Sequence, residues 1–137
     1  MKLLPVAKGS RAPEFFEEKN DCAVRAIANA CGVSYMKAHK ICAEWGRAKR
    51  ESMPVDDFDG ALKSTGKVKH VTSFKKDCFV IGKLSEKGVT LGKFVKENDT
   101  GTWVVMLCDH LLVVEAGNII DSGFTNSRSP VYYAWKV

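Results

Sequence analysis

Apolar residues in the first part of the chain recur at helical spacing, and polar or glycine residues divide them into segments. Ala23, Val24, Ile27, Ala28 and Cys31 share one face of a helix over about 22–31. Asn20 or Asp21 supplies its N-terminal cap and Gly32 its end. The small side chains of this face indicate a helix that lies deep in the fold.

Three further helices follow from the same reasoning. Ser34 caps a helix that runs to about Trp45, with Gly46 as its end and an inner face of Tyr35, Ala38, Ile41, Cys42 and Trp45. A shorter helix is expected around 55–64, before Gly66. Thr90 caps another through about Glu97, whose inward residues are Leu91, Phe94 and Val95.

The apolar pattern of the C-terminal third is typical of strands. We expect strands at 103–107, 111–114, 119–121 and 131–137, with a turn at 115–118, after earlier strands at 68–74 and 78–81. Helices followed by an antiparallel sheet predict one α+β domain over residues 1–137. Pro5 and Pro13 predict an irregular arm over 1–18, held to the core by Phe15 and Phe16.

Composition narrows the function classes. The chain has 45% hydrophobic and 27% charged residues, as in an ordinary globular protein, and its formal net charge of +5 favours an acidic substrate. The apolar start is interrupted by Pro5 and Lys8, and no apolar run could span a bilayer, so a cytoplasmic protein without membrane contact is expected. Basic residues are not interleaved with aromatics, so nucleic-acid binding is not expected. The sequence does not predict an oligomeric state.

Five cysteines without paired spacing indicate reduced thiols. Cys31, Cys42, Cys78 and Cys108 are interpreted as core residues, as are Trp45, Trp103 and Trp135. No metal is expected. The candidate ligands are His39 and Cys42 on one helix and Cys108 and His110 on one strand, and their spacing is not that of a zinc site.

Cys22 differs from the other cysteines because it stands where a polar loop becomes a helix. A helix N-terminus favours the nucleophilic thiolate. His110 opens a later strand, and Asp121 follows the next hairpin. A four-residue loop at 115–118 would pair Val114 with Ile119 and make His110 and Asp121 diagonal neighbours, about 7–8 Å apart. The helix of Cys22 must then pack on the face that His110 shares with Leu112 and Val114.

The chain resembles papain-like cysteine peptidases in three features: Asn20-Asp21-Cys22 at the start of a helix, His110 on a strand and Asp121 after a hairpin. The similarity is to the small bacteriocin-processing and phage-encoded kind, and it covers residues 20–31 and 102–122. The run 21–27 is also similar to the cysteine helix of ovarian-tumour-type deubiquitinases. The resemblance implies a papain-like core with a cysteine helix on an antiparallel sheet.

The resemblance also implies roles for single residues. Cys22 would be the nucleophile, His110 its base and Asp121 the group that orients the base, with no cofactor. The backbone N–H of Cys22 would help to hold the oxyanion. Related enzymes place a Gln five or six residues before the cysteine, where this chain has Glu17 and Phe16. Asn20 is therefore the candidate second oxyanion donor, or a plain helix cap.

The function expected from these residues is thiol-protease chemistry, the hydrolysis of a peptide or isopeptide bond in a protein or peptide substrate. Two alternatives stay open. The same triad serves acyltransferases, and the missing Gln fits a catalytically inactive papain-like fold that binds a protein, such as a phage-type protein that captures a host factor.

Overall fold

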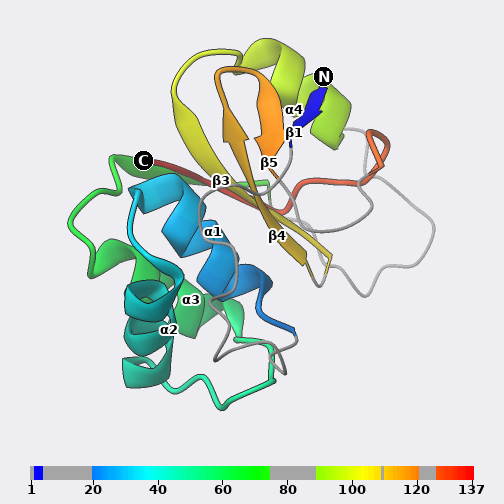
Figure 1. Ribbon diagram of the computed structural model, residues 1–137. Helices are drawn as coiled ribbons and strands as arrows, with labels where there is room; N and C mark the ends of the chain where they lie inside the picture. The colour runs from blue at the N-terminus through cyan, green and yellow to red at the C-terminus, as the bar shows by residue number, and fades with distance from the viewer. Residues whose placement is uncertain (1, 5–19, 75–88, 109, 121–125) are drawn as a thin grey trace.

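The computed structural model describes residues 2–4, 20–74, 89–108, 110–120 and 126–137 (Figure 1). These residues form an α+β fold, as the sequence predicts. The helices are α1 (Cys22–Cys31), α2 (Tyr35–Glu44), α3 (Val55–Lys63) and α4 (Leu91–Glu97). The strands are β1 (Lys2–Leu4), β2 (His70–Ser73), β3 (Thr102–Leu107), β4 (His110–Glu115), β5 (Asn118–Ile120) and β6 (Tyr133–Lys136).

The strands join in one sheet of order β1-β5-β4-β3-β6-β2. All neighbours are antiparallel except β1, which lies parallel to β5 and pairs Leu3 with Ile119. The prediction of an irregular arm is therefore wrong for residues 2–4. Phe15, Phe16 and the strand expected at 78–81 lie outside the described residues.

Each face of the sheet is covered by its own apolar cluster, because strand residues alternate between faces. Helices α1, α2 and α3 pack on the face that carries Val104, Leu111, Val113, Ile120 and Trp135. Helix α4 packs on the opposite face, which carries Trp103, Val105, Leu112, Val114 and Ile119. Figure 1 shows α1–α3 gathered on one side of the sheet and α4 on the other.

Local signals place the helix ends as expected. The Ser34 hydroxyl accepts a hydrogen bond from the Lys37 N–H at 3.1 Å, and the Thr90 hydroxyl accepts one from the Lys93 N–H at 3.2 Å. Gly32 ends α1 with φ 67°, in the left-handed region that glycine adopts easily.

Two residues expected in the core are exposed. Trp45 follows the last turn of α2 and is 43% exposed, with its ring against Gly60 of α3, where a Cβ would clash with the ring. Cys108 is exposed just beyond β3. Trp103, Trp135, Cys31 and Cys42 are buried as expected, and Cys78 lies outside the described residues.

The β4–β5 hairpin has the predicted register, with Val114 paired to Ile119. Its loop is tighter than the expected four residues, because Glu115 also pairs with Asn118. The two residues between them, Ala116 and Gly117, have φ 49° and 77°. Positive φ at both central positions is typical of a type I′ turn, whose twist matches that of the strands.

Candidate functional site

Cys22 and His110 line the same hollow, although they are far apart in the sequence. The hollow has a volume of about 540 Å³. Its described lining comes from the start of α1, the segment that enters α3, and the facing ends of β3 and β4: Asn20, Cys22, Ala23, Ser52, Met53, Pro54, Val55, Phe58, Met106, His110 and Leu111. The structure thus places the predicted residues Cys22 and His110 along one cavity.

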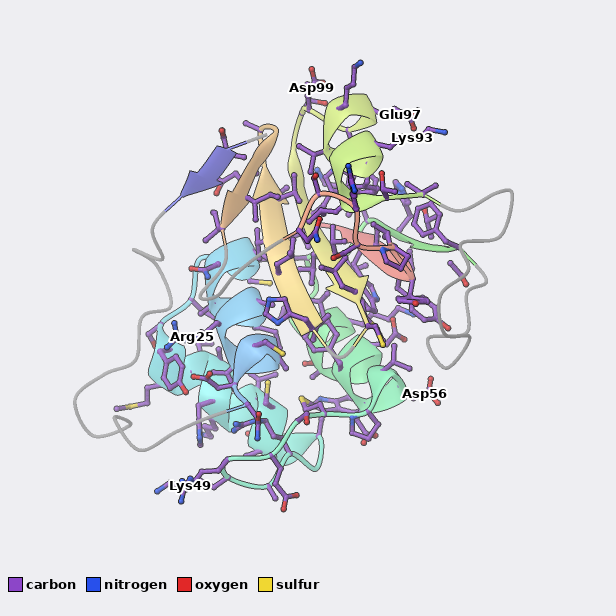
Figure 2. All side chains as sticks on the ribbon, turned by 90° about the vertical axis from the view of Figure 1, so that its right-hand side faces the viewer. Arg25, Lys49, Asp56, Lys93, Glu97 and Asp99 are labelled. Carbon is purple, nitrogen blue, oxygen red and sulfur yellow. The ribbon has the colours of Figure 1, made fainter. Side chains whose placement is uncertain are left out.

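Helix α1 begins at Cys22, and its N-cap residue Asp21 makes no side-chain cap hydrogen bond. The carboxylate of Asp21, at the cap position, is used elsewhere: it accepts a hydrogen bond from the Tyr35 hydroxyl at 2.8 Å and pairs with the Arg25 guanidinium at 3.2 Å. Figure 2 shows Arg25 beside α1. Asp21 is only 4% exposed, so both contacts compensate a buried charge. The first-turn N–H groups of α1 are consequently not taken by the Asp21 side chain.

The cysteines of the helical layer differ in environment. Cys22 is half-buried at the first position of α1. Burial raises the pKa of Cys42 to about 12; Arg47 opposes this rise and Cys22 adds to it. Burial also raises the pKa of Cys31, against the lowering effects of Thr65 and Lys67. Cys31 and Cys42 are therefore protonated, inert core thiols at neutral pH.

His110 is the first residue of β4 and pairs with Leu107 across the β3–β4 hairpin. The expectation about the packing face is wrong. Helix α1 covers the face of Leu111 and Val113, whereas Leu112 and Val114 lie on the side of α4. His110 still borders the hollow, because it stands at the end of β4 next to Leu111.

Asn20 lines the hollow but is already engaged. Its side-chain N–H₂ donates to the Arg50 carbonyl at 3.1 Å and so ties the α2–α3 loop to the start of α1. Both residues have left-handed backbones, with φ 51° at Asn20 and 68° at Arg50. Asn tolerates this region better than most residues, which explains its place at this bend. One of the two amide hydrogens of Asn20 is thus used in holding the wall of the hollow.

Asp121 follows β5 directly in the sequence and lies outside the described residues. The lining residues Ser52, Met53, Val55, Phe58 and Met106 were not singled out from the sequence. Pro54 before the third helical pattern signals a helix entry, but the contact between this entry and the start of α1 depends on tertiary packing.

Within the described ranges, no group of three or more His, Cys, Asp or Glu side chains could hold a metal ion. No helix in that same part of the chain has the length and apolar character to cross a membrane.

Comparison with known proteins gives no match to any protein-family model, curated protein or solved structure.

Proposed function

We propose that this protein is a cysteine-dependent hydrolase with a papain-like core that cleaves a peptide or isopeptide bond. The observation that carries the proposal is the hollow that both Cys22, at the N-terminus of α1, and His110, at the start of β4, line. A cysteine supplies the nucleophile, and a histidine supplies the base and acid that the reaction needs.

In the proposed reaction the thiol of Cys22 gives its proton to His110, and the sulfur attacks the substrate carbonyl carbon. The C–S bond forms as the carbonyl π electrons move onto oxygen. When the tetrahedral intermediate collapses, the C–N bond breaks and His110 protonates the departing amine, which leaves a thioester on Cys22. Water, deprotonated by His110, then attacks the thioester and releases the carboxylic acid and the thiol.

The position of the Asp21 side chain at the start of α1 supports this chemistry. The carboxylate of Asp21 turns toward Tyr35 and Arg25, so it does not compete for the N–H groups of the first helical turn. Such N–H groups are suitable donors to an oxyanion that develops beside Cys22. Asn20 would supply a second donor through its remaining amide hydrogen, and Asp121 would orient the imidazole of His110.

Hydrolysis of p-nitrophenyl acetate tests the proposal, because acetyl transfer to a thiol releases a coloured phenolate. We expect acetylated Cys22 to be found by peptide mass spectrometry after acid quenching. His110→Gln should slow its formation at least about 100-fold, since general base catalysis contributes that much. Cys108→Ser, a change of the exposed cysteine near β4, is the matched control and should leave the rate unchanged. Equal acetylation in wild type and His110→Gln would refute the proposal.

A second candidate is a binding protein that keeps this fold without catalysis. The hydrogen bond from Asn20 to the Arg50 carbonyl favours this second candidate, because this bond engages the side chain that is expected to hold the oxyanion. In that case the rate of Cys22 acetylation would be the same in the wild type and in His110→Gln. An acyltransferase differs again: glycinamide added to the assay would intercept the acetyl thioester and give an N-acetyl product in place of acetate.

A further inference from the structure

Three neighbouring strands place two basic side chains and a tryptophan in one row, on the face of the sheet where α4 packs. His70 of β2 pairs with Lys136 of β6, and Lys136 pairs with Trp103 of β3, so the three side chains lie side by side across the sheet. Trp103 belongs to the apolar cluster under α4, whereas Lys136 is half-buried and His70 is exposed. The row therefore begins in the core and ends in solvent on the last strand of the sheet.

The Trp103 ring holds both basic side chains in place. The Lys136 Nζ lies over the ring, 5.1 Å from its centroid, and the His70 ring meets it edge-on with centroids 5.3 Å apart. Phe94 of α4 packs edge-on against the same ring, also at 5.3 Å, and so fixes it. A Cβ at Gly101 would lie 3.5 Å from the Lys136 Nζ, so the ammonium also rests against the Gly101 backbone. Less side-chain freedom is thus left to be lost when a ligand binds.

The side-chain nitrogen atoms of this row have no acceptor among the described residues. Within that part of the chain the side chains of His70 and Lys136 form no hydrogen bond or ion pair, and the buried Trp103 indole N–H has no partner. By contrast, Lys63 and Lys93 each pair with a carboxylate on their own helix. Positive charge that is held at a fixed place without a carboxylate partner attracts an anion.

We propose that Lys136 and His70 bind a phosphate group at this end of the sheet. The ammonium has three N–H donors, and the imidazole donates at least one N–H in either protonation state. A phosphate group presents three strong acceptor oxygens, so it can bridge donors on neighbouring strands, and lysine is a common phosphate ligand. Trp103 is 6% exposed, so its ring positions the two donors and does not stack on the ligand.

The site does not depend on the proposed hydrolase function. The row lies on the face of the sheet where α4 packs, whereas the hollow of Cys22 is lined from the face that α1 and α3 cover. A failure of the hydrolase proposal would therefore leave the phosphate site untouched, and the reverse also holds.

Nuclear magnetic resonance of the histidine rings tests this site, because the chain has three histidines, His39, His70 and His110. The full chain is titrated at constant pH and ionic strength with sodium phosphate and, in separate samples, with phenyl phosphate, sodium acetate or sodium chloride. We expect both phosphates to shift the His70 signals to saturation and to leave those of His39 and His110 in place. Tighter binding of phenyl phosphate would identify an organic phosphate as the ligand, and equal binding would identify the free ion.

Lys136→Met removes the charge and keeps an apolar side chain on the Trp103 ring. It should weaken phosphate binding about tenfold, because a hydrogen bond between charged groups is lost. Lys63→Met is the matched control, since it removes the same charge from α3 on the other face of the sheet and should not change the affinity. Lys136→Gln is a second variant for the case that Lys136→Met does not fold.

An affinity for phosphate that both Lys136 variants leave unchanged would overturn the proposal, as would the absence of a saturable shift at His70. A His70 shift that acetate or chloride reproduces at the same concentrations would also overturn it, because the site would then not select phosphate. Equal shifts at all three histidines would have the same meaning, since they would indicate a general effect of salt.

Discussion

The hydrogen bond from Tyr35 to Asp21 holds the start of α1, so Tyr35→Phe is a sharp test of how this end is stabilised. The change removes one hydroxyl and keeps the ring, which is 3% exposed. The bond is 2.8 Å long and ends on a carboxylate that is 4% exposed. Hydrogen bonds to charged groups contribute about 1.5–3 kcal/mol. We therefore expect the free energy of unfolding to fall by about 2 kcal/mol.

Urea denaturation measures this loss. With a slope of about 2 kcal/mol per molar urea, typical of small proteins, the midpoint should move down by about 1 M. Because Cys22 follows Asp21 directly, alkylation of Cys22 by iodoacetamide should also change in rate, whereas alkylation of the exposed Cys108 should not.

Tyr133→Phe is the matched control. Tyr133 stacks on Trp135, and its hydroxyl makes no hydrogen bond within the part of the chain that the structure describes. Its loss should cost less than about 0.5 kcal/mol, as for substitutions that remove no specific contact. A Tyr35→Phe variant no less stable than Tyr133→Phe would refute the view that the Asp21 carboxylate depends on Tyr35.

Three further predictions concern stability. Ala116→Asn places a residue that tolerates positive φ before Gly117 in the hairpin turn, and thermal unfolding should show a gain of about 1 kcal/mol. The Trp135 indole N–H donates to the Asp59 carboxylate at 2.8 Å, and Asp59→Ala removes this acceptor. Chemical denaturation should show that the free energy of unfolding falls by about 1–3 kcal/mol. Asp59→Asn keeps an acceptor oxygen and should lose less stability. The pKa of Cys42 is raised to about 12 in the folded protein, so the contribution of its thiol to stability is complete below pH 9 and is lost as the pH rises toward 12. Denaturation under reducing conditions should show this fall in the free energy of unfolding. Cys42→Ala should make the fall shallower.

The features that the sequence predicts correctly depend on near neighbours in the chain. Ser34 and Thr90 cap their helices through N–H groups three positions away, and Gly32 ends α1 through its own backbone. The register of the β4–β5 hairpin follows from alternation over a few residues. The α+β class follows from the order of these local elements.

The features that the sequence does not predict depend on distant contacts. Trp45 continues the apolar stripe of α2, but it lies on Gly60 at the surface because α2 ends before it. The face that α1 covers depends on which side of β4 the helical layer packs, and alternation from His110 indicates the wrong one. Local signals indicate Cys22 and His110, whereas other lining residues of their hollow come from the entry of α3, from β3 and from β4, which only the fold brings together.

The parallel pairing of β1 with β5 has a consequence for how the chain becomes ordered during synthesis. Leu4 and its partner Ile120 are far apart in the sequence, so β1 must wait for its neighbour until the residues between them have left the ribosome. At translation rates of about 5–20 residues per second, this delay is of the order of ten seconds. Strand β1 would therefore join the sheet late, although its residues are made before those of all the other strands described.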